Sequence, residues 1–204
     1  WAITHGARKL ALRWGIVARR DQRRRHEYDT PLLGGTSFYV VLVVMTVLMT
    51  LVNSPLGEPF VTLRFAACFI GGLTLIFGIG ALDDWIELKA PPKFAAQSAA
   101  AILVMMSEPQ LPALFREAGL HSALVVPILL LWTVGVINAM NMIDGLDGLC
   151  VGIGAISALT LTAITVASGS PLSYGAILTA GLEGCCLVFL VHNRNPAKIF
   201  LGDS

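Results

Sequence analysis

Charged residues are scarce in this chain. Asp, Glu, Lys and Arg make up 13% of its 204 residues, and hydrophobic residues make up 55%. A soluble domain contains about 25% charged residues. This composition excludes an ordinary soluble domain and indicates an integral membrane protein. The formal net charge of +1 carries little information, and we expect the lipid bilayer, not nucleic acid, as a partner.

Cysteine is also rare. The four cysteines lie in or beside apolar runs and lack the spacing of metal ligands. Cys185 and Cys186 are adjacent, so on a helix they point to different sides and a shared metal ion is not expected. We interpret all four as small packing residues.

Long apolar runs dominate the remainder of the chain. They are continuous rather than alternating, which predicts helices, and crossing the hydrocarbon takes about 20 apolar residues. We therefore predict an all-α, polytopic transmembrane helix bundle. Six spans are expected, at about residues 36–52, 60–82, 94–107, 121–140, 149–167 and 172–192. The third is short, and Pro91-Pro92 favour an earlier start because proline suits the first turn of a helix.

Two regions are expected. Residues 1–35 would form a cytoplasmic interfacial segment that opens with an amphipathic helix, and residues 36–204 would form a transmembrane catalytic domain. The chain begins at Trp1 and ends at Ser204, beside an apparent site residue. We therefore expect the catalytic domain to be truncated at both ends.

The spans also predict which segments share a side of the membrane. If residues 19–35 are cytoplasmic, six spans bring 83–93, 141–148 and 193–204 to the same side. Lysines and arginines gather there, and the positive-inside rule independently agrees. The basic residues are Arg19, Arg20, Arg23, Arg24, Arg25, Lys89, Lys93, Arg194 and Lys198. We expect a site on the cytoplasmic face of the inner membrane.

Three polar clusters interrupt the apolar runs: Asp83-Asp84, residues 138–149 and residues 196–204. Polar side chains are costly at membrane depth and usually serve function there. On one helix, Asn138, Asn141 and Asp144 would share a face, with Asp147 one turn further. Their oxygen atoms suit a hard cation such as Mg²⁺, which typically binds few carboxylates and leaves positions for substrate phosphates. The nearby lysines favour a phosphorylated substrate.

Other interpretations remain open. Asp83-Asp84 alone suits a solvated helix end, and Gln97 would either orient Lys93 or cap a polar stripe. Intramembrane acids are also typical of a cation-coupled transporter, although transport sites lie near the midplane. A non-catalytic membrane scaffold is a third candidate.

The ordered motifs resemble the polyprenyl-phosphate N-acetylhexosamine-1-phosphate transferases, the glycosyltransferase 4 family. The matching elements are Arg24-Arg25-His26 with residues 30–35, residues 82–84 with Lys93 and Gln97, residues 138–149, and residues 195–204. This resemblance implies transfer of a sugar-1-phosphate from a UDP-sugar to a polyprenyl phosphate, with release of UMP.

The resemblance also implies roles for individual residues. Asp203 and Asn141 would contact Mg²⁺, with Mn²⁺ as an alternative. Asp83 and Asp84 would position or deprotonate the lipid phosphate, and Lys93 would hold phosphate charge. Asp144 and Asp147 would orient the nucleotide-sugar, completing the catalytic set. The expected substrate-binding residues are Asn138, Gln97, Gly145, Lys198 and His26.

The substrate branch is inferred from two features. The short connection from Asp84 to Lys93 and the Thr-Pro-Leu-Leu-Gly-Gly string at 30–35 look more like the GlcNAc-1-phosphate branch. We therefore expect UDP-GlcNAc, or a related UDP-N-acetylhexosamine, and undecaprenyl phosphate as substrates. The alternative branch is phospho-MurNAc-pentapeptide transferase. For the assembly of the protein, a homodimer is one candidate.

Overall fold

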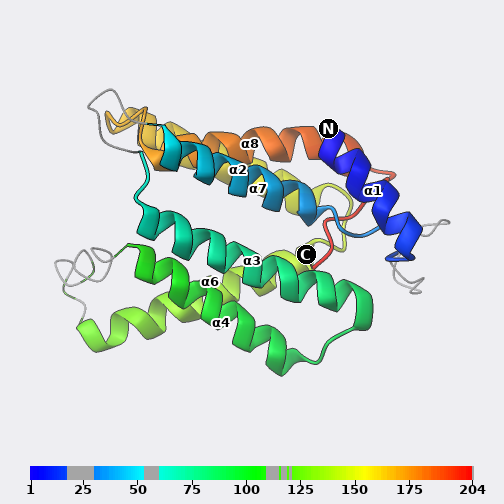
Figure 1. Cartoon of the computed structure of the whole chain (residues 1–204), viewed down its shortest axis with the longest axis horizontal. Helices are drawn as coiled ribbons and strands as arrows, with labels where there is room; N and C mark the ends of the chain where they lie inside the picture. The colour runs from blue at the N-terminus through cyan, green and yellow to red at the C-terminus, as the bar shows by residue number, and fades with distance from the viewer. Residues whose placement is uncertain (18–29, 53–59, 109–114, 116–118, 120, 204) are drawn as a thin grey trace.

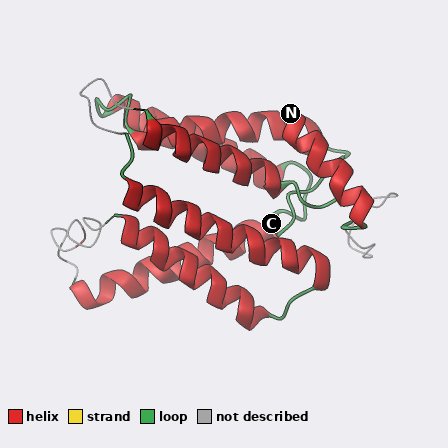
Figure 2. Cartoon of the chain, viewed as in Figure 1, coloured by secondary structure: helices red, strands yellow, loops and turns green. Residues whose placement is uncertain are grey.

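A computed structural model describes residues 1–17, 30–52, 60–108, 115, 119 and 121–203. Within these residues the chain is helical, and none of them forms a β-strand (Figure 2). The helices are α1 (Ala2–Trp14), α2 (Gly35–Leu51), α3 (Leu63–Ile86), α4 (Ala90–Ser107), α6 (Ser122–Ile143), α7 (Leu149–Ala167) and α8 (Tyr174–Asn193). The predicted all-α class is confirmed.

Local sequence explains where these helices begin and end. The Thr62 hydroxyl accepts the Phe65 N–H at the start of α3, and the Ser173 hydroxyl accepts the Ala176 N–H at the start of α8. Prolines lie in the first turn of α4, where their missing N–H costs no helical hydrogen bond. α1 ends at Trp14 and is capped by Gly15, whose φ of 69° lies in the left-handed region that favours glycine.

Among the residues that the structure describes, four helices are long and apolar enough to cross a membrane: α3, α6, α7 and α8. Each coincides with a predicted span, and the bounds predicted for α7 are those observed. α2 is apolar but has only 17 residues. α4 begins at Ala90, beside Pro91-Pro92 as the prolines indicated. The chain is thus a multi-pass membrane protein, whereas the count of six spans stays a prediction.

The helices form two groups that lie side by side. In Figure 1, α2, α7 and α8 lie above α3, α4 and α6. One apolar core cluster centres on Phe189 of α8, with Val151, Ala155, Cys186 and Ile199. Ile199 is fully buried although it belongs to the segment after α8. This burial fixes the C-terminal segment against the helices.

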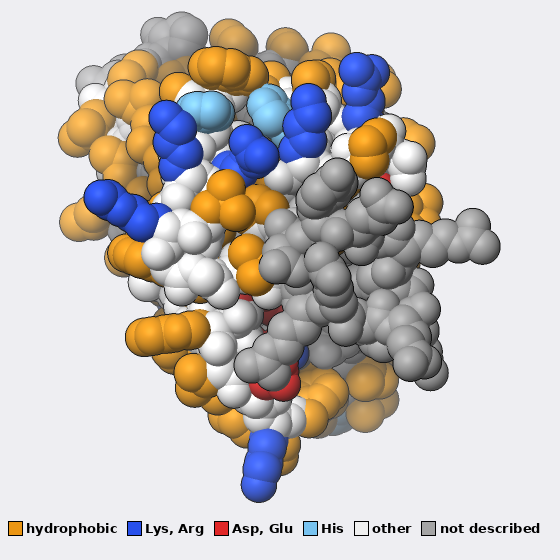
Figure 3. Space-filling view, turned by 90° about the vertical axis from the view of Figure 1, so that its right-hand side faces the viewer, with side chains coloured by type: hydrophobic (Ala, Val, Ile, Leu, Met, Phe, Trp, Pro, Cys, Tyr) orange, Lys and Arg blue, Asp and Glu red, His pale blue; other side chains and the backbone are white. Residues whose placement is uncertain are grey.

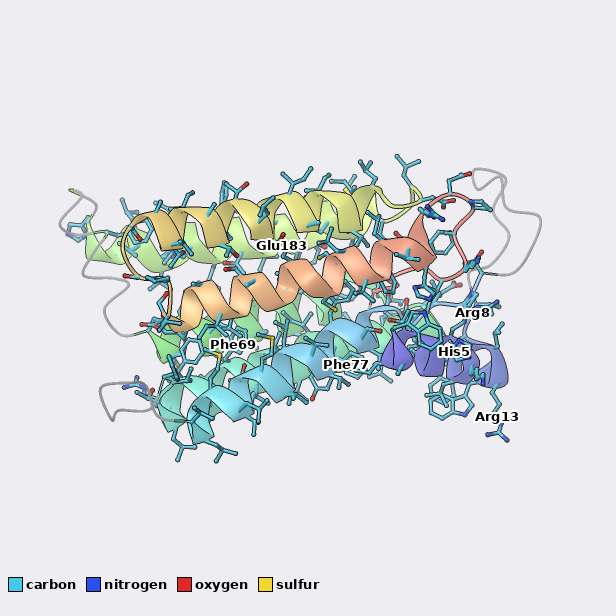
Figure 4. The ribbon with its side chains drawn as sticks, turned by 90° about the horizontal axis from the view of Figure 1, so that it is seen from above. His5, Arg8, Arg13, Phe69, Phe77 and Glu183 are labelled. Carbon is cyan, nitrogen blue, oxygen red and sulfur yellow. The ribbon has the colours of Figure 1, made fainter. Side chains whose placement is uncertain are left out.

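The predicted amphipathic helix is α1, and it packs across one end of the bundle. The hydroxyls of Thr4 and Ser37 are 3.0 Å apart, and the Arg8 Nε donates to the Lys198 carbonyl. In Figure 4, His5 and Arg8 lie where α1 meets the end of α8. The α3–α4 connection, the α6–α7 turn and the C-terminal segment all lie at this same end (Figure 1).

Candidate active site

The polar clusters meet in a cavity of about 340 Å³ at the end of the bundle next to α1. Six of the predicted site residues line it, together with residues that the sequence analysis did not select. The predicted residues are Asp83, Asp84, Asn141, Asp144, Gly145 and Asp203, and the additional ones include Gly15, Ile16, Trp85, Glu87 and Gly202. Segments far apart in the sequence therefore build one acidic cavity.

Lys93 joins two of the acids. Its Nζ lies 2.6 Å from Asp83 Oδ2 and 2.7 Å from Asp203 Oδ2. The Leu88 N–H donates to the other Asp83 oxygen at 2.7 Å. Lys93 stands in the first turn of α4 and Asp83 near the end of α3, so the short α3–α4 connection sets this pair. Asp203 then fixes the C-terminal segment onto it.

Asp84 and Asp144 bind the backbone of that C-terminal segment. The Asp203 N–H donates to Asp84 Oδ1 at 2.9 Å, and the Gly202 N–H donates to Asp144 Oδ2 at 3.3 Å. Gly202 has a φ of 76°, and a Cβ there would lie 2.5 Å from Asp84 Oδ2. Glycine is therefore required by both conformation and space.

The segment at 30–35 pairs with the C-terminal segment through backbone hydrogen bonds. The Phe200 N–H donates to the Pro31 carbonyl at 3.0 Å, and the Gly34 N–H donates to the Phe200 carbonyl at 3.1 Å. The Gly35 N–H donates to the Leu201 carbonyl at 2.9 Å. Backbone pairing thus holds Asp203 beside the acids of α3.

The predicted helical stripe is only partly correct. Asn138 and Asn141 lie on α6, but the helix ends at Ile143 and Asp144 caps it. Asp147 lies in the following turn and does not line the cavity. Its Oδ2 accepts hydrogen bonds from the Asn195 side chain and the Ala197 N–H, each at 3.1 Å. Gly145 and Asp147 fall where the backbone turns toward α7, so the 3.6-residue period no longer applies.

Gln97 and Asn138 contact each other instead of the larger cavity. The Asn138 Nδ2 donates to Gln97 Oε1 at 2.7 Å, and Gln97 is almost fully buried. A second cavity of about 110 Å³ is lined by Lys93, Gln97, Asn141 and Asp203 among others. This contact indicates that Gln97 orients the side-chain amide of Asn138 on α6.

Lys198, a predicted substrate-binding residue, is not brought to either cavity. The Lys198 side chain is exposed and lines neither cavity, while its carbonyl accepts from Arg8. His26 lies outside the described residues, as do Arg19, Arg20, Arg23, Arg24 and Arg25. Their roles stay predictions.

Sequence analysis missed Asn193. This residue is 1% exposed; its side chain accepts the Gly148 N–H at 3.0 Å and donates to the Ile199 carbonyl at 2.9 Å. It therefore ties the start of α7 to the C-terminal segment. The sequence did contain a signal for this residue, because Asn193 is a polar residue at the end of the apolar run that forms α8.

The electrostatics of the cavity depend on Asp203. Burial raises the pKa of its carboxyl above the ordinary range, and the hydrogen bond with Asp83 raises it further. Lys93 opposes this effect. Among the described residues, no three His, Cys, Asp or Glu side chains are grouped closely enough to hold a metal ion. The carboxylate and carboxamide side chains that line the cavity nevertheless offer oxygen ligands, which suits Mg²⁺ bound through few protein ligands.

The fold and this site define a multi-pass, all-α membrane protein with an acidic cavity at one end of its helices. The family model for glycosyl transferase family 4 matches residues 66–204. The chain belongs to that family.

Similar proteins include two named for GlcNAc-phosphate transfer. A decaprenyl-phosphate N-acetylglucosaminephosphotransferase of Mycolicibacterium smegmatis is 38% identical over 98% of this chain and 52% of its own length. A probable undecaprenyl-phosphate N-acetylglucosaminyl 1-phosphate transferase of Bacillus subtilis is 32% identical over 99% and 54%. A phospho-N-acetylmuramoyl-pentapeptide-transferase of Synechococcus sp. is 34% identical over 97% and 57%. The chain thus spans little more than half the length of these relatives.

Proposed function

We propose that the protein transfers an N-acetylhexosamine-1-phosphate, preferably GlcNAc-1-phosphate, from a UDP-sugar to undecaprenyl phosphate. The products are UMP and a pyrophosphate-linked lipid sugar for cell-envelope polysaccharide synthesis. One observation carries the proposal: segments at 31–35, 83–93, 141–145 and 200–203 converge on one acidic cavity. The names of the relatives at 38% and 32% identity support the same reaction.

The side chains suggest catalysis by alignment and charge. A phosphate monoester has its second pKa near 6, so most of the acceptor is dianionic at neutral pH. A strong base is then unnecessary. The catalytic task of the site is to hold two phosphates in line and to neutralise their charge. Lys93 supplies a cation, while Asp83 and Asp84 orient the groups around it.

Mg²⁺ is the proposed cofactor, with Mn²⁺ as a substitute. Several carboxylates line the cavity, and a cavity so acidic would repel phosphates without an additional cation. Asp203 and Asn141 would hold the ion, with other positions left to water and phosphate oxygens. When bound, the ion supplies positive charge to the phosphate oxygens.

We also propose six spans and a cytoplasmic site on the inner membrane. Figure 3 looks onto the end of the molecule that carries the cavity, where Lys and Arg side chains lie above and below the few acidic ones in view. Positive residues favour the cytoplasmic side. The opposite end carries the α7–α8 turn at Ser168 and Ser173.

Phospho-MurNAc-pentapeptide transfer is the second candidate, because a relative so named is 34% identical over nearly the whole chain. The full-length protein should be assayed with Mg²⁺, undecaprenyl phosphate and either UDP-GlcNAc or UDP-MurNAc-pentapeptide. UMP release with UDP-GlcNAc supports the proposal, and release with the pentapeptide donor alone replaces it with the second candidate. If neither donor reacts while liposomes show substrate-independent cation flux, transport is the better reading.

A further inference from the structure

The second cavity lies behind Lys93, toward the interior of the helix bundle. Its volume is about 110 Å³, and Lys93 lines it without lining the larger, acidic cavity. Its apolar wall includes Ile76, Ile79, Ile137 and Leu201, and its polar residues are Lys93, Gln97, Asn141 and Asp203. Ile76 and Ile79 precede Asp83 on α3, so this cavity lies deeper in the bundle than the acids.

The Lys93 ammonium group needs a third acceptor. A lysine side chain carries three N–H donors. Two of them bond to carboxylates, one to Asp83 Oδ2 and one to Asp203 Oδ2. Within the part of the chain that the structure describes, no third protein acceptor is bonded to this ammonium group. Buried donors are almost always paired with protein or with ordered water.

Gln97 cannot be that acceptor, because its oxygen is already used. The Asn138 Nδ2 donates to the Val134 carbonyl at 2.8 Å and to Gln97 Oε1 at 2.7 Å. A backbone carbonyl only accepts, so it identifies the Asn138 atom as the NH₂ group and the Gln97 atom that meets it as the oxygen. The remaining amide atom of Gln97 is Nε2, which only donates. Lys93 and Gln97 therefore both bring N–H groups to this cavity.

A water molecule satisfies both donors at once. Its two lone pairs accept from two N–H groups, and its own hydrogens can bond to the oxygens of Asn141 and Asp203, which line the same cavity. A bound water needs roughly 10–15 Å³ of such volume and about two to four polar partners. The cavity meets both conditions. A metal ion is disfavoured at this place, because it would lie against the Lys93 ammonium group.

We propose that the second cavity is a water-binding site and that Gln97 is a positioning residue that acts on Lys93 through the bound water. The water accepts from Lys93 Nζ and Gln97 Nε2, while the contact with Asn138 fixes the orientation of the Gln97 amide. Three acceptors then hold the ammonium group in one position, which preorganises its charge. The water site follows from geometry alone, whereas the effect of Gln97 on transfer rests on the proposed function.

Hydroxyl-radical footprinting tests the water directly. X-ray pulses would split bound water inside the full-length protein in nanodiscs, and the radicals oxidise the side chains that touch it. Label is expected on Ile79 and Leu201, and Gln97→Met should lose most of it. Val125 is the control, because it is 1% exposed, lines neither cavity and should stay unlabelled. An absence of label on Ile79 and Leu201, or full labelling in Gln97→Met, overturns the proposal.

Kinetics separate a positioning role from a structural one. Gln97→Met should lower kcat about tenfold, the order of one hydrogen bond to a charged group, and leave the KM for the UDP-sugar unchanged. In a Lys93→Met background the same change should have no further effect, because its action passes through Lys93. Equal losses in the two backgrounds would show that Gln97 only supports α6, which overturns the proposal. Ser98→Ala is the control, since Ser98 is the next residue of α4 and lines neither cavity.

The two tests separate this inference from the proposed reaction. If the wild-type protein releases no UMP with any UDP-sugar, the proposed transfer fails, and footprinting alone still decides the water site. If transfer occurs but Ile79 and Leu201 stay unlabelled, only the water site fails.

Discussion

Lys93 and Asp203 are 110 positions apart in the sequence, and their Nζ and Oδ2 atoms lie 2.7 Å apart. The same ammonium group lies 2.6 Å from Asp83 Oδ2. This contact joins the first turn of α4 to the segment beyond α8. It can form only when the intervening helices bring the C-terminal segment back to the end of α3, so it reports on assembly of the whole site.

Replacing Lys93 by methionine should nearly abolish transfer. Asp83 and Asp203 would then face each other without their shared cation, and like charges at this range disfavour each other. We expect UMP release to fall by about 10²–10³-fold, the range found when one charge-stabilising group is removed. Lys89→Met is the control, since Lys89 is exposed and lines neither cavity. Wild-type activity in Lys93→Met would contradict the role of this lysine.

Removal of divalent cations should stop the reaction. EDTA is expected to abolish UMP release from the full-length protein, and Mg²⁺ should restore it. Asp203→Asn should strongly depress the rate and raise the Mg²⁺ concentration needed for half-maximal activity, because a neutral amide is a weaker ligand for a hard cation. Glu108→Gln, which alters a carboxylate bonded to Tyr174 instead, should keep the wild-type requirement. An unchanged rate in Asp203→Asn would exclude this residue as a metal ligand.

Some of this site was predictable because helices obey local rules. The bounds of α7 follow from its apolar run, the start of α4 from its prolines, and the amphipathic α1 from its mixture of basic and apolar residues. Counting apolar runs then indicated that the polar clusters share one end, and the structure brings them to one cavity. That conclusion needed only the parity of the spans.

Contacts made by turns were not predictable. The helical period was extended through Asp147, but α6 ends at Ile143 and Asp147 instead holds the backbone near Ala197. Asn193 was missed because its partners are backbone groups of two distant segments. From the sequence, Trp85 is the type of residue that anchors a helix at the membrane interface. Only the packing of α1 against α3 makes it part of a cavity.

A methyl group at Gly202 should damage the site. In Gly202→Ala the new Cβ would lie 2.5 Å from Asp84 Oδ2, and the φ of 76° would be strained. The Asp203 N–H would then be displaced from Asp84, and we expect a rate loss of about 100-fold, as reported for small misplacements in active sites. Gly152→Ala, with open space around the new methyl group, should retain activity. Equal rates for the two variants would contradict the close packing of this turn.

Loss of the Asn193 side chain should destabilise the C-terminal segment. Asn193→Leu leaves the Gly148 N–H and the Ile199 carbonyl without this partner. Each such loss costs about 1–3 kcal/mol, so the Tm of the purified protein should fall clearly. Asn195→Leu is the control, since Asn195 is exposed and makes a single side-chain bond to Asp147. A Tm for Asn193→Leu no lower than that of the control would show that the segment is held by other contacts.

Cysteine labelling should show that the α3–α4 connection and the segment after α8 share the cytoplasmic side. Lys89 and Asn195 are exposed at the site end of the helices, and Ser170 is exposed in the α7–α8 turn. In a variant whose native cysteines are replaced, Lys89→Cys and Asn195→Cys should react with an impermeant maleimide only in inverted vesicles. Ser170→Cys should react in intact cells. The parity of the spans and the positive-inside rule both require this pattern, and labelling of Lys89→Cys and Asn195→Cys from opposite sides would separate α3 from the C-terminal segment across the bilayer.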